Sequence, residues 1–185
     1  KKANLKSEIK NLFEEVSGEL NLSVLGWRKV PVDAQAIGDL SKSNMPEIIQ
    51  IFISDKNFSN STDFEKKLFV LRKIVENRFN SNNISSDAQK NFYICSLSCR
   101  TLIYKGLFTP EQLELFYPDL CQEDLISGFS MVHARFSTNT LGTWKLAHPY
   151  RYVVHNGEIN TVRGNRNWMK AREASLSKNH LTEYF

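Results

Sequence analysis

Apolar residues recur with two different periods along the chain, and this mixture constrains the fold more than any other feature. A spacing of three to four residues predicts helices over residues 3–16 and 63–79. Short runs rich in Val, Ile and Phe predict strands over 22–30 and 47–55. These strands lack a clean alternation with polar residues, which indicates that both faces of their sheet are covered. The sequence therefore predicts a layered α+β domain without internal repeats.

Glycine, proline and capping residues suggest where these elements begin and end. We expect Gly18 to stop the first helix, and Thr62 or Asp63 to cap the second. Gly26 is expected to break the first strand and Pro31 to end it.

The second half of the chain continues the mixed pattern. Apolar and aromatic residues predict two closely spaced strands in NFYICSLSCRTLIYKG, followed by a short helix in TPEQLELF with Pro110 in its first turn. Two further strands are predicted in SGFSMVHARFS and PYRYVVHNG. A final helix is predicted from Thr161 to about Leu181, with an interruption at Gly164.

Composition narrows the class of protein. The 185 residues suit one domain, and with 41% apolar and 24% charged residues the chain should bury a core. The net charge of +4 is spread along the sequence, whereas a nucleic-acid module concentrates Lys and Arg on one face. No apolar run approaches the roughly 20 residues that span a bilayer. We therefore expect no nucleic-acid partner, no membrane and a cytoplasmic protein.

The three cysteines are Cys95, Cys99 and Cys121, an odd number that fits no disulfide framework or metal-binding motif. Reduced thiols in a reducing compartment suit them best.

Arg135 belongs to the part of the sequence between His133 and Arg172 that is richest in unusual residues. It follows an apolar strand start, where a buried guanidinium is costly unless it meets a carboxylate. That carboxylate could belong to a substrate or to an Asp or Glu of the protein. Spacing alone leaves both interpretations open.

The dipeptide Asn156-Gly157 stands at the end of a predicted strand. An Asn side-chain amide and a Gly backbone amide can both point at one developing oxyanion, which is the strongest device for acyl transfer. Taken without context, however, the same dipeptide more often marks a turn.

Histidines occur in the same region but match no metal site. The spacing of His133, His148 and His155 fits no zinc motif, so we expect structural hydrogen bonds from them and no metal.

Two strings in this region, HARFSTNT and AHPYRYVVHNGEINTVRGNRNWMKARE, closely resemble the glutamate synthase branch of the class II glutamine amidotransferases. The resemblance implies an N-terminal-nucleophile fold, a four-layer α/β/β/α sandwich. It also implies that Arg135 binds the α-carboxylate of L-glutamine, while Ser137 and Thr138 shape the same pocket. The Asn156 side chain and the Gly157 backbone amide are implied to form the oxyanion hole.

The family's nucleophile is a cysteine at the mature N-terminus, whose own α-amino group is the base. Such a residue cannot lie in mid-chain, so the resemblance assigns this role to none of the three cysteines. The chain begins with Lys1, and the family's acidic residue for the substrate amino group is expected beyond Phe185. We therefore expect residues 1–185 to be a partial amidotransferase domain that is inactive alone.

The resemblance also implies partners. Ammonia from glutamine is expected to pass to 2-oxoglutarate in the remainder of the glutamate synthase chain, where FMN and an iron–sulfur cluster are held. An electron-donor subunit or ferredoxin is a further expected partner, and this segment is expected to hold no cofactor. The alternative is a non-catalytic glutamine-binding or interaction module of the same fold. A sister amidotransferase is disfavoured by the run that follows Gly157.

Overall fold

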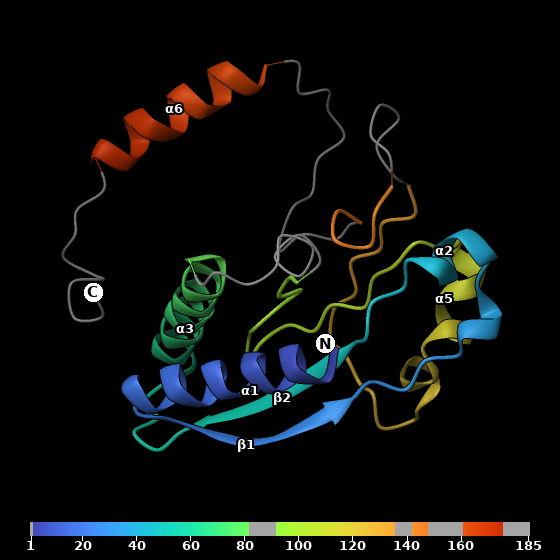
Figure 1. The fold of residues 1–185 in the computed structure, drawn as a ribbon, viewed down its shortest axis with the longest axis horizontal. Coiled ribbons are helices and arrows are strands. Elements are labelled where there is room, and N and C mark those ends of the chain that lie inside the picture. The colour runs from blue at the N-terminus through green and yellow to red at the C-terminus, as the bar shows by residue number, and fades with distance from the viewer. Residues whose placement is uncertain (1, 82–91, 136–141, 148–160, 176–185) are drawn as a thin grey trace. The chain divides into compact units, whose positions relative to one another are not determined.

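The protein is described here by a computed structural model that covers residues 2–81, 92–135, 142–147 and 161–175 (Figure 1). The chain divides into two compact units, Lys1–Arg151 and Tyr152–Phe185, which we describe separately. Within the first unit, helices pack on a small antiparallel sheet, which confirms the α+β class.

The first helix, α1, spans Lys2–Glu19. Its inward face places Phe13 and Val16 in the core, at 4% and 0% exposure. The helix was predicted to stop at Gly18, but it continues through Gly18 to Glu19. The chain turns at Asn21, two residues after the helix ends. There Asn21 adopts a left-handed conformation with φ of 55°, which Asn tolerates better than most residues.

Strands β1 (Leu22–Lys29) and β2 (Ile49–Asp55) form an antiparallel pair. Val24 lies opposite Ile53 and Gly26 opposite Phe52, so Leu25 is an extra residue in β1. This is a β-bulge. The predicted break at Gly26 is therefore a local irregularity, and the strand continues through it.

Helix α3 spans Ser61–Ser81, two residues longer at each end than predicted. The Asn60 side chain accepts a hydrogen bond from the Asp63 backbone amide at 2.9 Å, the bond that an N-cap residue makes. The Asp63 carboxylate accepts one in return from the Asn60 amide group at 2.6 Å. The prediction of Thr62 or Asp63 as the cap was wrong, because Asn60 is an equally good cap lying just upstream.

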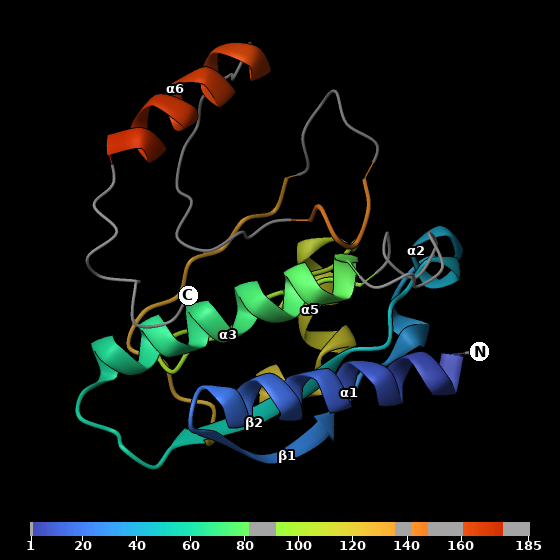
Figure 2. The same ribbon diagram turned by 60° about the vertical axis from the view of Figure 1, so that its left-hand side comes forward.

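One face of the sheet is covered by α1 and α3, which lie side by side (Figure 2). Their apolar faces and the sheet enclose the first core. Its buried members are Phe13, Val16, Leu22, Phe64, Leu68, Leu71, Val75 and Leu97.

A second core forms among the short helices and turns that follow β1 and precede the second unit. It lies among a 3-10 turn η1 (Ala34–Ala36), the short helices α2 (Asp39–Ser43) and α5 (Pro110–Phe116), and the turn η2 (Pro118–Cys121). Pro110 begins α5 as predicted. The buried members of this core are Val30, Ile37, Phe116, Tyr117 and Trp144.

The two strands predicted in residues 91–106 are not formed among residues 92–106. The Glu65 carboxylate on α3 accepts hydrogen bonds from the Ser98 hydroxyl at 2.9 Å and from the Cys99 backbone amide at 2.5 Å. Apolar side chains of the same stretch, Phe92, Ile94 and Leu97, pack against the first core. The apolar pattern thus reflects burial against α3 rather than strand pairing.

The strand predicted in residues 127–137 is also absent over its described part, residues 127–135. Phe129 and Val132 are 80% and 75% exposed. A strand needs a partner to satisfy its backbone, and no described segment pairs with this one. The strand predicted at 149–157 lies outside the described residues.

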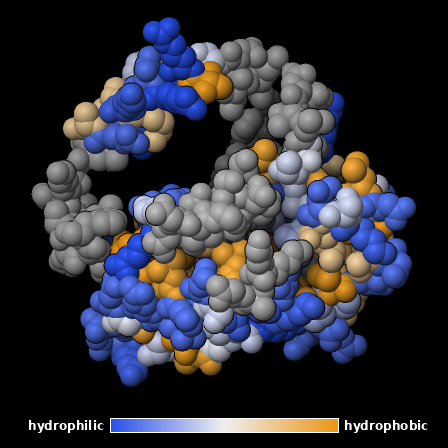
Figure 3. Space-filling view, in the orientation of Figure 1, coloured by the Kyte–Doolittle hydropathy of each residue, from blue (hydrophilic) through white to orange (hydrophobic). Residues whose placement is uncertain are grey.

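In the second unit the described element is α6, Val162–Ser175. Gly164 does not interrupt it, and the Gly164 backbone amide donates to the Thr161 hydroxyl at 3.0 Å, as at a capped helix start. The face of α6 visible in Figure 3 is mainly hydrophilic. No helix in the described part of the chain is both long and apolar enough to cross a membrane.

Candidate functional site

The predicted site residues are unevenly described. Arg135 is the last residue before the gap at 136–141, so Ser137 and Thr138 lie outside the described residues. Asn156 and Gly157 also lie outside them. Their predicted roles therefore remain predictions.

Arg135 is exposed. Its backbone amide donates to Nδ1 of His133 at 3.3 Å, which confirms a structural hydrogen bond for that histidine. Among the described residues Arg135 forms no ion pair within 4.0 Å. His148 and His155 lie outside them.

A tight turn at residues 143–147 follows the gap after Arg135. The backbone amides of Leu146 and Ala147 both donate to the Thr143 carbonyl, at 3.1 and 2.9 Å. The Leu146 amide also lies 3.2 Å from the Thr143 hydroxyl. Its Trp144 and Ala147 are only 4% and 2% exposed, so the turn is docked on the unit rather than loose.

Trp144 is the apolar half of this docking. Its ring lies 5.6 Å from that of Phe116 and 6.0 Å from that of Phe108, between centroids. Its indole N–H donates to the Ser41 carbonyl at 3.0 Å, which satisfies its polar atom. The turn is thereby joined to α2 and α5.

Gly106 makes this approach feasible. A Cβ at Gly106 would lie 2.6 Å from Cζ3 of Trp144 and still closer to the ring of Phe108. Only glycine, which has no side chain, leaves room for both rings.

Lys105 makes the polar contacts that hold the 143–147 turn. The sequence did not lead us to single out this residue. Only 8% of it is exposed. Its ammonium donates to the carbonyl oxygens of Lys145 at 2.9 Å and Ala147 at 2.8 Å, and it lies 5.1 Å from the ring centroid of Tyr93. A lone lysine inside the apolar string TLIYKG was the available signal.

Burial also shifts the acid–base properties of this region. It lowers the pKa of Lys105, because the charged ammonium loses water, although nearby Cys95 opposes the shift. Burial raises the pKa of Tyr93 to about 12. It also raises the pKa of Tyr117, whose hydroxyl donates to the Lys105 carbonyl at 2.8 Å. Both phenols therefore stay neutral around an ammonium whose proton is held less tightly than usual.

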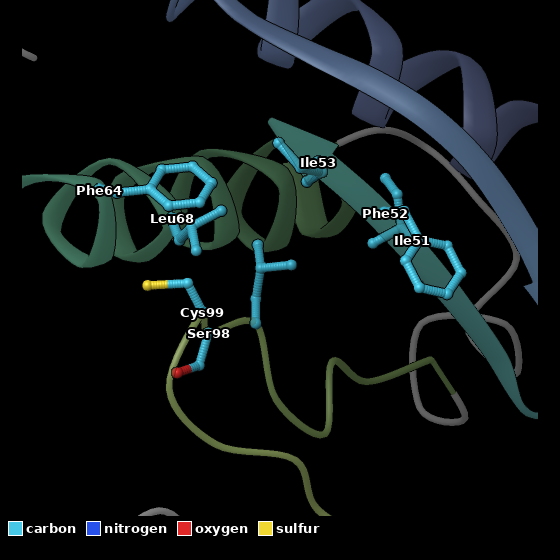
Figure 4. Close-up of a pocket in the computed structure, with 8 residues that line it drawn as sticks. Ile51, Phe52, Ile53, Phe64, Leu68, Ser98 and Cys99 are labelled. Carbon is cyan, nitrogen blue, oxygen red and sulfur yellow. The ribbon is translucent and has the colours of Figure 1, made fainter. Parts of the chain in front are cut away.

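A separate hollow of about 160 Å³ lies elsewhere in the unit. Figure 4 shows the side chains of β2, α3 and residues 97–99 that surround it. Six of the eight residues that line it are apolar, and Ser98 and Cys99 are the polar ones. It includes no predicted site residue.

The cysteines are free. Burial raises the thiol pKa of Cys95, and burial together with Glu65 raises that of Cys99. A raised pKa keeps a thiol in its weakly nucleophilic form. Both thiols are therefore weak nucleophiles.

Metal or cluster binding needs several ligands close together. Over the described ranges, no three His, Cys, Asp or Glu side chains gather in a way that could hold a metal ion. The described residues thus do not fit an iron–sulfur cluster.

Known proteins with similar sequences point to one family. Over 88% of its length, the chain is 48% identical to the "Glutamate synthase [NADPH] large chain" of Bacillus subtilis. It is 42% identical over 95% of its length to the "Glutamate synthase [NADH]" of Saccharomyces cerevisiae. With the "Ferredoxin-dependent glutamate synthase 2, chloroplastic" of Arabidopsis thaliana the identity is 43% over 94%.

These relatives are much longer proteins. The matched region covers 10%, 8% and 10% of them respectively, so the chain spans about a tenth of the relatives it matches. The family description "Glutamine amidotransferases class-II" matches residues 1–185, the whole of the sequence. The chain therefore belongs to the class-II glutamine amidotransferases, and its relatives are glutamate synthases.

Proposed function

We propose that this chain acts within a longer protein that hydrolyses L-glutamine to glutamate and ammonia and transfers the ammonia to 2-oxoglutarate. The observation that carries the proposal is the class-II amidotransferase match over residues 1–185, together with relatives named glutamate synthase. Each half-reaction yields one glutamate, and the transfer step fixes ammonia onto 2-oxoglutarate. The proposed role is therefore glutamate biosynthesis and ammonia assimilation.

Arg135 is proposed to bind the α-carboxylate of glutamine. A guanidinium can hold a carboxylate through two parallel hydrogen bonds. Its exposure leaves it open to a ligand, and its backbone amide is already tied to His133. Ser137 and Thr138, in the same stretch, are proposed to shape the pocket around that carboxylate.

Asn156 and Gly157 are proposed to stabilise the tetrahedral intermediate. The thiol of the family's N-terminal cysteine, which is not among residues 1–185, adds to the amide carbon of glutamine, and its proton passes to the cysteine's α-amino group. The side-chain amide of Asn156 and the backbone amide of Gly157 donate to the resulting oxyanion. The C–N bond then breaks, ammonia leaves with the proton, and water hydrolyses the thioester to glutamate.

Other parts of the longer protein are proposed to complete the fold, to hold the cofactors and to receive electrons. We place the described helices and sheet in a four-layer α/β/β/α sandwich completed by other parts of the chain, in the cytoplasm. FMN and an iron–sulfur cluster are proposed for the synthase part, and no step is assigned to them here. The relatives' names divide among NADPH, NADH and ferredoxin, so an electron-donor subunit or ferredoxin is a proposed partner.

Ammonia release from glutamine tests this function. The assay compares residues 1–185 alone, the longer protein, and the longer protein with Asn156→Ala or, as a control, Asn57→Ala in the exposed turn after β2. We expect release only from the longer proteins, with a loss of about a hundredfold or more for Asn156→Ala. Equal rates for both variants would remove the oxyanion role. No release from the longer protein would favour a non-catalytic glutamine-binding module.

A further inference from the structure

Helix α6 carries most of the excess positive charge of the chain. It contains four basic residues, Arg163, Arg166, Lys170 and Arg172, and one acidic residue, Glu173. Four positive charges against one negative charge leave an excess of three, out of an excess of four for all 185 residues. Basic residues occur along the whole sequence, but outside α6 acidic residues nearly balance them.

Three of these basic residues form one stripe along the helix. An α-helix turns by about 100° per residue, so Arg163, Arg166 and Lys170 lie within about 60° of one another around the axis of α6. The seven positions from the first to the last span about 10 Å. We call these three residues the basic stripe of α6.

The basic stripe opposes the formation of its own helix. Arg163 and Arg166 stand three positions apart, and Arg166 and Lys170 four, which are the spacings at which like charges repel on a helix surface. Arg163 also lies in the first turn, where the positive end of the helix dipole disfavours a cation, and no acidic residue occupies that turn. Glu173, three positions after Lys170, can offset only one end of the stripe.

The described residues contain no acidic partner for the stripe outside α6. None of the ion pairs formed among them includes Arg163, Arg166 or Lys170. The sequence as a whole has 24 basic and 20 acidic residues, and therefore no surplus of carboxylates. Because the chain spans about a tenth of the relatives it matches, the longer protein has many further residues that could supply them.

The layout of α6 favours an acidic protein surface over a membrane or a nucleic acid. A helix that lies on a membrane needs a continuous apolar face. Opposite the basic stripe, however, Trp168 shares its side of α6 with Gly164, Asn165 and Arg172. Three cations are also few beside the roughly six to ten phosphate contacts of a typical DNA-binding protein.

We propose that the basic stripe of α6 is a docking surface for an acidic segment of the longer protein that lies outside residues 1–185. Carboxylates of that segment pair with Arg163, Arg166 and Lys170 and remove their mutual repulsion. The helix is thereby stabilised by the contact that it makes. This inference goes beyond glutamine hydrolysis and does not depend on it.

Zero-length carbodiimide coupling in the longer protein tests the docking, because the reagent joins a lysine amine only to a carboxylate in contact with it. Conditions are set so that Lys6 and Glu47, an ion pair of 2.6 Å, are coupled in the same sample. Peptide mapping by mass spectrometry then identifies the carboxylate that is joined to Lys170. We expect an Asp or Glu outside residues 1–185.

Charge variants of the two arginines supply a second measurement. The double variant Arg163→Gln/Arg166→Gln removes two charges of the stripe, so the coupling yield at Lys170 should fall about threefold or more. The matched control Arg163→Lys/Arg166→Lys keeps both charges and should keep the yield within about twofold. Coupling of Lys6 to Glu47 should be unchanged in both variants, which controls for the reagent and for the fold.

Three results would overturn the proposal: no coupling at Lys170 while Lys6 and Glu47 are coupled, coupling of Lys170 only to carboxylates within residues 1–185, or an undiminished yield in the Arg→Gln double variant. Binding of duplex DNA or of anionic phospholipid vesicles that this variant loses would also overturn it, because the stripe would then have a different partner. Absence of ammonia release would bear on the proposed function alone and leave the coupling result as it is.

Discussion

Arg28 in β1 holds Asp119 in η2 through two hydrogen bonds of 2.8 and 2.5 Å, although the residues stand 91 positions apart. The Asp119 carboxylate also accepts from the Tyr104 hydroxyl at 3.0 Å, and Arg28 donates to Gln50 in β2 at 2.7 Å. The paired geometry joins the sheet to the second core. The Arg28 guanidinium, with help from Tyr104, holds the pKa of Asp119 below its usual range despite burial.

Replacement of Asp119 should therefore be costly. We expect Asp119→Asn to lower the free energy of unfolding by about 1–3 kcal/mol, because Arg28 and Tyr104 lose a charged acceptor. Urea unfolding of the chain at low concentration measures this. The control is Glu47→Gln, which removes an exposed ion pair with Lys6 and should cost less than about 1 kcal/mol. Equal costs would show that the Arg28–Asp119 pair contributes no more than a surface contact.

Acid should destabilise the unit through a second ion pair. The Asp55 side chain is 3% exposed and lies 2.6 Å from the Lys67 ammonium, whose hydrogen bond lowers the pKa of Asp55. The folded pKa is thus below the unfolded value of about 3.9. The resulting stability is present above that value and is lost as pH falls through the folded pKa.

Asp55→Asn should remove this part of the pH dependence. We expect the mutant to be less stable than wild type at pH 7, and the difference to shrink as the pH falls below about 4. The measurement is urea unfolding of wild type and mutant at pH 7 and at a pH below about 4. A difference that stays constant or grows in acid would contradict the assigned shift.

Gly106 should not tolerate a side chain. Alanine there would press on Trp144 and Phe108 in a packed core, so we expect Gly106→Ala to cost about 1–3 kcal/mol in unfolding free energy. The matched control is Gly18→Ala in α1, where a Cβ meets nothing within 4 Å. That change should stabilise the chain by about 0.5–1 kcal/mol through helix propensity. If Gly106→Ala left the stability unaltered, the close packing of the Trp144 ring against Gly106 would be contradicted.

The stretch 127–135 has a strand-like sequence but no strand partner among the described residues. If other parts of the longer protein complete the sheet, backbone amides of this stretch should exchange slowly there and rapidly in residues 1–185 alone. Hydrogen exchange of both proteins, with β1 amides as the reference, measures the difference. Rapid exchange in both would mean that the strand prediction was wrong for the longer protein also.

Local patterns predicted the helices and the first sheet well. The helical spacing that buries Val16 and Leu68 is visible in the sequence because one apolar face must meet the core. Ends were harder to predict. Several neighbouring residues can cap a helix, and only the structure distinguishes Asn60 from Thr62 and Asp63.

Long-range contacts could not be predicted. The apolar side chains of 92–97 suit either a strand or an irregular segment packed on α3, and Glu65, about thirty positions earlier, decides between them. Lys105 is similar, because its acceptors are backbone oxygens some forty positions later. Such oxygens leave no trace in a sequence. The predicted chemistry of Arg135 and Asn156 came instead from a family resemblance, which the family match supports without testing each residue's role.

The most direct test of the central claim is the discrimination between glutamine and its α-amide, in which the carboxylate is neutralised, by the longer protein and its Arg135→Met variant. Ammonia released from the side-chain amide is measured for both substrates as kcat/KM. We predict that wild type prefers glutamine strongly, and that Arg135→Met loses about tenfold or more of that preference, because the guanidinium–carboxylate pair is gone. A variant that keeps the full preference would contradict the assignment of Arg135 as the carboxylate-binding residue, and with it the glutamine site placed in this chain.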